Sequence, residues 1–159
     1  MNRAYSNIQA ILKEGEIVPE TITHPPVLTC EEADAFTPDP KAGLKSLVLQ
    51  TKSRTNVAVC VLLGDQRVDF KAVQNLMGGR VSMMPEEDAC DYVGCSRGAI
   101  PPFGHAQPLA IYVDNAVLDH PVVYFNPGIN TETMGLKKDD FFRVLEWHHA
   151  VFATISKPS

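Results

Sequence analysis

The chain has 159 residues, of which 45% are hydrophobic and 21% charged, and its formal net charge at pH 7 is −5. This length is enough for one domain with its own core, and no apolar run approaches the roughly 20 residues of a membrane-spanning helix. An acidic chain lacks the basic surface that non-specific binding of long nucleic acids requires, so a nucleic-acid partner should be held by a few cations in a pocket. The charged, amphipathic N-terminus is unlike a secretory signal. We therefore expect a single domain over residues 1–159, in the cytoplasm and with no membrane partner.

The four cysteines, Cys30, Cys60, Cys90 and Cys95, are scattered along the chain. None forms a CxxC pair and no two lie beside spaced histidines, which is the arrangement that a structural zinc site normally needs. Cys90 and Cys95 resemble one half of such a site, but the sequence offers no second half. We therefore expect reduced cysteines and no bound metal.

The first third of the chain predicts a helix, an extended segment and a short helix. Residues 3–13 place apolar side chains at helical spacing and are followed by Gly15, a helix stop signal. IVPETITHPP (17–26) is typical of an extended segment that ends at two prolines. Thr29 is suited to cap a short helix, because the acids after it favour a helix N-terminus. TPDPKAG (37–43) predicts a loop.

The clearest strand pair follows this loop. LKSLVLQ (44–50) and NVAVCVLL (56–63) are β-rich and are separated by a short polar turn, which predicts a β-hairpin in the middle of the protein. Two helices are expected next, one over 69–79 that ends at two glycines and one over 85–93 that opens on a proline and two acids. RVSMM (80–84) predicts a short strand between them.

The last third of the chain predicts strands over 109–114, 122–126 and 131–136, a final helix over 139–149 and an edge strand over 150–155. Strands and helices thus interleave irregularly, without an internal repeat or a domain-splitting linker. We expect an α+β fold in which a mixed β-sheet curls like a barrel and helices surround it.

Lys45 and Ser46 lie within the apolar run LKSLVL. Successive side chains of a strand point to opposite faces, so one of these two polar groups must point into an apolar face. A buried lysine costs free energy unless it is paired or meets an anion, which makes Lys45 a candidate substrate-binding cation. The alternative is an edge lysine whose ammonium reaches solvent.

His24 precedes two prolines, which hold the backbone extended and present the imidazole stiffly. The residue is either a substrate contact or a structural histidine, and the sequence alone favours the second. The other histidines suggest no chemistry. These are His105, His120, His148 and His149.

The segment GCSRGAIPPFGH (94–105) is rich in glycine and proline and has one formal charge. Glycine lets the backbone approach a ligand closely, and proline fixes the residues around it. The N–H groups of Gly98 and Ala99 are therefore candidates to hold a ligand oxygen. The alternative is a rigid crossover beneath the sheet, with Phe103 in the core.

The sequence contains neither a P-loop nor a GxGxxG motif. No two carboxylates are paired in an apolar segment. An enzyme with this sequence would depend on positioning and electrostatics, or on groups that the substrate supplies.

Four separated stretches, LKSLVL, VAVCVLLGDQRVDFKAV, GAIPPFG and VDNAVLDHPVVYFNPG, resemble the YbaK/ProX family of aminoacyl-tRNA deacylases. That family also supplies the inserted editing domain of bacterial prolyl-tRNA synthetases. The similarity runs from about His24 to Leu145. It implies an α+β fold and hydrolysis of the ester between a wrong amino acid and the 3′-terminal adenosine of a tRNA. It also implies water or a substrate hydroxyl as nucleophile, and neither metal nor cofactor. An aminoacyl-tRNA synthetase is a second candidate partner.

The resemblance also implies roles for individual residues. Lys45 matches the family's lysine, expected to meet a 3′-end phosphate or the substrate, and Gly98 to Pro102 match its GxxxP loop, expected to hold the aminoacyl carbonyl or terminal ribose through backbone amides. We therefore assign Lys45, Gly98 and Ala99 to catalysis. The residues assigned to substrate binding are His24, Ser46, Ile100, Pro102, Phe103, Gly104, Asn126 and Gly128.

The sequence departs from the family in ways that leave the amino-acid specificity open. Asn126 stands where the alanine-clearing branch has a histidine, and an asparagine does not titrate. Ser46 replaces an asparagine of that same branch, whereas the HPP at His24 resembles the ProX branch. Three functions therefore compete. The first is a trans-editing deacylase, which we favour. The others are a non-catalytic module that binds a nucleotide or a tRNA CCA end, and a small-ester or thioester hydrolase with Cys95 as nucleophile.

Overall fold

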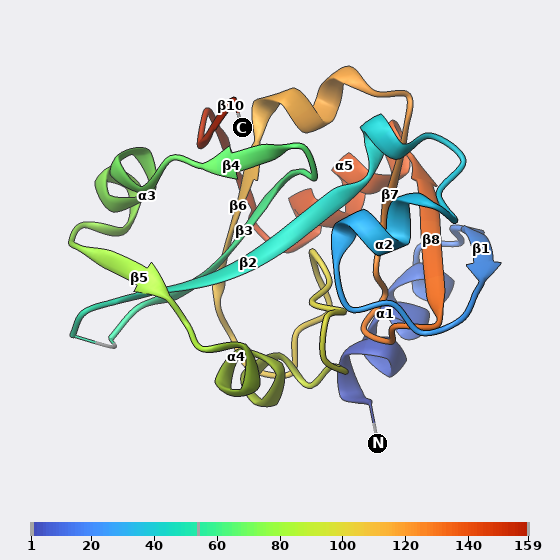
Figure 1. Ribbon diagram of the computed structural model, residues 1–159, viewed down its shortest axis with the longest axis horizontal. Coiled ribbons are helices and arrows are strands. Elements are labelled where there is room, and N and C mark those ends of the chain that lie inside the picture. Colours follow the sequence, from blue (N-terminus) through green and yellow to red (C-terminus); the bar gives the residue numbers. More distant parts are fainter. Residues whose placement is uncertain (1, 54, 159) are drawn as a thin grey trace.

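The structure is a computed structural model that describes residues 2–53 and 55–158. Its largest sheet has five strands in the order β5-β2-β3-β6-β9 (Figure 1). β2 is antiparallel to both β3 and β5, whereas β6 is parallel to both β3 and β9, so the sheet is mixed as predicted. These strands are β2 (Leu44–Thr51), β3 (Val57–Leu63), β5 (Val81–Met83), β6 (Ala110–Asp114) and β9 (Val151–Ala153).

Two smaller antiparallel sheets complete the β-structure of the described chain. One has the order β1-β8-β7 and the other pairs β10 with β4. The expected barrel-like curl is wrong, because none of the sheets formed by the described residues closes on itself. Between the larger two sheets the structure has one isolated bridge, from Gly43 to Tyr124. The strands are β1 (Glu20–Thr23), β4 (Gln66–Val68), β7 (Val122–Phe125), β8 (Glu132–Lys137) and β10 (Ser156–Pro158).

The helices begin and end at the residues that local chemistry favours. Asn2, Thr29 and Asp69 each cap a helix by accepting a hydrogen bond from a backbone N–H of its first turn. Gly78 and Gly94 end their helices in the left-handed conformation. The helices are α1 (Arg3–Glu14), α2 (Cys30–Asp34), α3 (Phe70–Met77), α4 (Glu86–Val93) and α5 (Lys138–Trp147), and the 3₁₀ helices are η1 (Pro40–Ala42) and η2 (Asn115–Asp119).

Strand β3 lies at the centre of the core because both of its faces are covered. Val59, Val61 and Leu63 belong to one buried cluster, which includes residues of α1 and α5. The alternate residues, Ala58 and Cys60 among them, belong to a second cluster with α3. The alternation of the strand thus places these two clusters on its opposite faces. Its neighbour β2 is buried less completely, which leaves room for a site along that strand.

No helix in the described part of the chain combines the length and apolar character that crossing a membrane would take.

Candidate active site

A cavity of about 470 Å³ lies along β2, between the start of α2, the N-terminal end of α4 and the segment 94–105. Most of its lining is apolar, with Leu44, Leu47, Met83 and Met84 among the contributors. Five residues that the sequence assigns to the site line it together. They are Lys45, Ser46, Gly98, Ile100 and Asn126.

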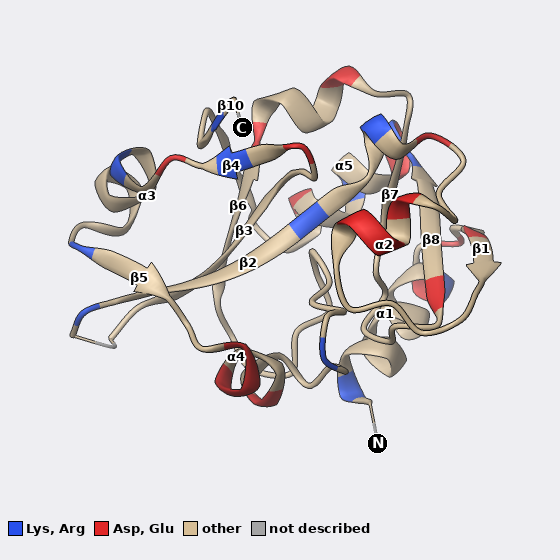
Figure 2. Cartoon of the chain, viewed as in Figure 1, with Lys and Arg blue, Asp and Glu red and all other residues tan. Residues whose placement is uncertain are grey.

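Lys45 brings a cation to this cavity from the middle of an apolar strand. It pairs with Leu62 of β3 and is half-buried. In residues 2–53 and 55–158 the ion pairs are Arg97 with Glu86 and Arg143 with Asp140, so Lys45 has no carboxylate partner. Figure 2 shows a blue band on β2, whose sequence LKSLVLQT has Lys45 as its charged residue, and acidic residues on α2 and α4. A half-buried lysine without a carboxylate partner is suited to bind an anion from a ligand.

Cys30 at the start of α2 lies near Lys45 and also lines the cavity. Burial raises the pKa of its thiol above the ordinary value, and the charge of Lys45 opposes that rise. The thiol is therefore protonated at neutral pH and forms part of the cavity wall.

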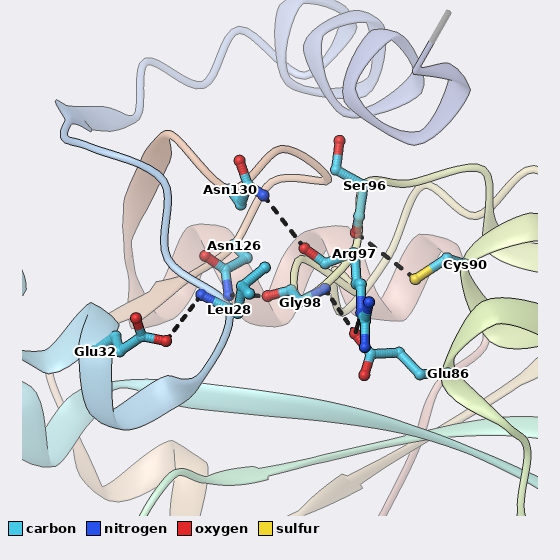
Figure 3. A network of polar contacts seen from close by, with 9 residues as sticks. All are labelled: Leu28, Glu32, Glu86, Cys90, Ser96, Arg97, Gly98, Asn126 and Asn130. Carbon is cyan, nitrogen blue, oxygen red and sulfur yellow. Dashed lines mark hydrogen bonds and ion pairs between the residues drawn. The ribbon is translucent and has the colours of Figure 1, made fainter.

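Gly98 occupies a backbone position that only glycine fits without strain. Its φ is 75°, in the left-handed region, and a Cβ there would lie 2.7 Å from the carbonyl oxygen of Leu28. The segment therefore packs directly on the chain before α2. Its N–H donates a hydrogen bond to Glu86 Oε1 at 3.1 Å (Figure 3).

The sequence led us to expect that the Ala99 N–H holds a ligand oxygen, but in the structure this N–H has an acceptor within the protein. Ala99 is fully buried, and its N–H donates to the carbonyl oxygen of Ser96 at 3.1 Å. The amides of both Gly98 and Ala99 thus have internal acceptors, which the sequence could not show. Gly98 is held by a half-exposed side chain, whereas Ala99 is held within a turn. No hydrogen bond of the described chain has the Ile100 N–H as its donor.

The loop after β7 holds the carbonyl groups of the same segment. Asn126 Nδ2 donates to the Gly98 carbonyl at 3.3 Å, and Asn130 Nδ2 donates to the Arg97 carbonyl at 3.4 Å (Figure 3). Asn126 Oδ1 is buried and has no hydrogen-bond partner among the described residues. Asn126 therefore contributes by fixing the segment as well as by lining the cavity.

The second half of the segment turns away from the cavity into the core. Pro102, Phe103 and Gly104 are buried, and the Phe103 ring packs edge-on against Phe125 at 5.5 Å between centroids. His105 Nε2 donates to the Pro101 carbonyl at 2.7 Å and closes this turn. The core position that we weighed as the alternative for Phe103 is therefore confirmed.

Gly128 and His24 also lie outside the cavity lining. A Cβ on Gly128 would lie 3.0 Å from the Tyr5 nitrogen, so this glycine packs on α1. His24 is buried, and its ring stacks on Phe36 with 5.0 Å between centroids. Its Nδ1 is 2.9 Å from the Pro25 carbonyl, which only accepts, so Nδ1 carries a proton and Nε2 accepts from Thr133 Oγ1 in the neutral ring. These contacts are those of a structural histidine.

The remaining nucleophile candidate, Cys95, is absent from the cavity lining. Burial is the largest cause that raises the pKa of its thiol, and the neighbouring Cys90 raises it further. A thiol in this state is a poor nucleophile, so the geometry disfavours the thioester-hydrolase alternative. The described residues include no group of three His, Cys, Asp or Glu side chains placed to hold a metal ion.

Sequence reasoning missed Glu86, which lines the cavity and accepts the Gly98 N–H. Its position after Pro85 was explained by the preference of a helix N-terminus for acids. Glu86 and Gly98 are twelve residues apart in the sequence, and this spacing shows that they meet only once the fold is known.

Comparisons with known proteins show the family to which the chain belongs. A model of the family described as "Aminoacyl-tRNA editing domain" matches residues 24–144. The chain is 25% identical over 147 residues to the "Multifunctional Ser/Thr-tRNA deacylase ProXp-y" of Escherichia coli strain K12, covering 89% of this chain and 88% of that protein. It is 25% identical over 152 residues to the "Prolyl-tRNA editing protein ProX" of Acetoanaerobium sticklandii, covering 92% and 93%.

A solved structure shows the same fold. It is named "Crystal structure of a putative trans-editing enzyme for prolyl tRNA synthetase", has a TM-score of 0.80 and 22% identity, and covers 99% of both chains. The family match spans most of the sequence and includes every residue that lines the cavity. The chain therefore belongs to the YbaK/ProX family of aminoacyl-tRNA editing domains.

Proposed function

We propose that this protein is a trans-editing deacylase that hydrolyses the ester between a wrong amino acid and the 3′-terminal adenosine of a tRNA. Its family consists of editing domains, and the two relatives described above are named for deacylation and editing. The observation that carries the proposal is that Lys45 and Gly98 line one cavity. A cation and a backbone amide that meet at one site can stabilise the negative charge that develops in ester hydrolysis.

Lys45 has two possible anions in such a substrate, a phosphate near the 3′ end and the ester carbonyl oxygen as it gains charge. Both uses are favoured by a cation without a competing carboxylate, and Lys45 is half-buried and has no such partner among the described residues. The tRNA would therefore be held locally, as the net charge of −5 leads us to expect.

We retain the Gly98 N–H as the hydrogen-bond donor to the carbonyl oxygen of the substrate. This N–H is occupied by Glu86, a surface side chain that can rotate away, whereas the N–H of Ala99 is held by the backbone of Ser96. Asn130 holds the peptide unit that contains the Gly98 N–H through the Arg97 carbonyl, and Asn126 holds the next peptide unit through the Gly98 carbonyl. We assign Ala99 a structural part in this turn and Gly98 the catalytic contact.

The nucleophile in this proposal is water or a hydroxyl of the substrate. Ser46 lines the cavity, but the hydrogen bonds of residues 2–53 and 55–158 include none that links Ser46 to a histidine or carboxylate base. An unactivated serine is a weak nucleophile. Positioning and charge stabilisation are then the means by which the protein accelerates the reaction.

One observation favours a second function, a non-catalytic module for a tRNA CCA end. Both amides expected to bind the carbonyl have acceptors in the free protein. A panel of tRNAs, each charged with a different wrong amino acid, separates the two functions. The deacylase should hydrolyse at least one of them about tenfold or more above the spontaneous rate. Binding of the CCA end without hydrolysis of any panel member would identify the binding module.

A further inference from the structure

Glu86 is the only acid that lines the cavity, just as Lys45 is the only base, within the described residues. It opens α4, and its side chain is half-exposed. Both of its recorded contacts use one oxygen, Oε1, which accepts from the Gly98 N–H at 3.1 Å and lies 3.4 Å from Arg97 Nε. Oε2 has no partner within residues 2–53 and 55–158, and Figure 3 shows it pointing away from the contacts of Oε1.

An aminoacyl ester carries an ammonium group close to its carbonyl group, so a site that binds one must also accommodate the other. Its α-ammonium is joined to the carbonyl carbon through one carbon, so the ammonium nitrogen and the carbonyl oxygen lie only about 3 Å apart. A site that binds the carbonyl at the Gly98 N–H must therefore present an acceptor for the ammonium close by. Glu86 Oε1 is at hydrogen-bond distance from that same N–H.

We propose that Glu86 binds the α-ammonium of the aminoacyl group and makes the site selective for substrates whose amino group is free. This inference rests on the proposed deacylase function. On binding, the ammonium takes the carboxylate, and the substrate carbonyl oxygen replaces Oε1 at the Gly98 N–H. The charged pair is a stronger partner for the carboxylate than a neutral amide.

Arg97, the other partner of Glu86, competes only weakly with a substrate ammonium for the carboxylate. The side chains of Arg97 and Glu86 are 77% and 48% exposed, and an exposed ion pair contributes little to stability. Arg97 can therefore release the carboxylate or remain beside it. A substrate whose amino group is acylated supplies no ammonium, so Glu86 stays on the Gly98 N–H and blocks the carbonyl site.

The test compares Glu86→Gln with the wild type on two forms of one substrate. Glutamine keeps the shape of the side chain and an oxygen that accepts the Gly98 N–H, but it has no charge. The substrates are the best aminoacyl-tRNA of the panel and the same aminoacyl-tRNA after N-acetylation. We expect the wild type to prefer the free amine by about 10- to 100-fold in kcat/KM. In Glu86→Gln the free-amine substrate should lose about that factor, and the acetylated one should change little.

Glu87→Gln is the matched control. Glu87 is on the same first turn of α4 and is exposed, and it does not line the cavity. The variant removes the same charge from the protein and from the helix N-terminus, and its preference for the free amine should equal that of the wild type. An equal loss on both substrates in Glu86→Gln would overturn the inference, because it would mean that Glu86 acts only by holding Gly98.

A binding measurement separates failure of this inference from failure of the deacylase function. The probes are 3′-alanylamino-3′-deoxyadenosine, which is not an ester, and its N-acetyl derivative. Tighter binding of the free amine by the wild type, lost in Glu86→Gln, supports the inference even where no tRNA is hydrolysed. Equal affinity of the wild type for the two probes overturns it even where hydrolysis is fast.

Discussion

Gly98 meets two requirements at one residue, a left-handed backbone and direct contact with another stretch of chain. A side chain there costs about 1–2 kcal/mol for the backbone alone, and its Cβ would clash with the Leu28 backbone. Since a backbone cannot move as cheaply as a side chain, Gly98→Ala should shift the peptide that faces the cavity.

We expect Gly98→Ala to lose about tenfold or more in kcat/KM for deacylation and to unfold at a lower urea concentration. Gly79→Ala is the matched control, because Gly79 has no left-handed φ and no atom would lie within 4 Å of its Cβ. Deacylation kinetics and urea unfolding of both variants check this. Equal activity of the two variants would show that the position of Gly98 does not matter.

A single residue could be assigned to the site from the sequence where its type is unusual for the neighbouring sequence. Lys45 in an apolar strand and Gly98 before two prolines are such cases, and both line the cavity. Glu86 fits its helix N-terminus well, so nothing in the sequence marked it. The acceptor of the Ala99 N–H depends on a turn whose geometry only the structure gives.

Among the elements, the segment 94–105 has two functions in succession. Gly98 and Ile100 line the cavity, whereas Phe103 anchors the other half between Phe125 and Phe141. The prolines between them keep the two halves in a fixed relation. The packing of Phe103 in the core therefore fixes the position of the half of the segment that lines the cavity.

Truncation of the anchor should destabilise the protein strongly. Phe103 has no exposed surface, and Phe→Ala in a core typically costs about 3–5 kcal/mol. We expect Phe103→Ala to lower the free energy of unfolding in urea by that amount. Phe70→Ala serves as control. Phe70 is 40% exposed, so its truncation should lower the free energy of unfolding far less. Equal losses in the two variants would contradict the anchor.

The sequence predicted which elements form better than how they pair. The hairpin β2–β3 and the edge strand β9 were expected, because alternation and β-branched residues are local signals. β4 and β10 have only three residues each and were missed. The barrel-like curl was wrong because alternation shows which face of a strand is buried and does not show which strand lies beside it.

At the scale of the whole molecule, the buried His105 links stability to pH. Burial is the main cause that lowers its pKa to about 4, and the hydrogen bond to the Pro101 carbonyl opposes this. The unfolded chain, with a pKa near 6.5, binds this proton more readily than the folded protein does. The stabilising contribution is therefore complete above about pH 6.5 and is lost as pH falls toward 4.

Urea unfolding at pH 7, 6, 5 and 4.5 measures this dependence. The lowered pKa sets an upper limit of about 3 kcal/mol on the loss from His105 across the interval. His105→Gln can still donate to the carbonyl and does not titrate, so its stability should decline less steeply over the same range. Parallel declines of the two proteins would contradict the assignment to His105.

The meeting of Lys45 and Gly98 at one cavity is tested most directly by Lys45→Ala in single-turnover deacylation of the best mischarged tRNA. Lys71→Ala, which removes an exposed lysine from α3, is the control, and thermal unfolding confirms that both variants are folded. We predict a rate at least about 100-fold below the wild type for Lys45→Ala and an unchanged rate for Lys71→Ala. A folded Lys45→Ala protein that deacylates at the wild-type rate would contradict the account.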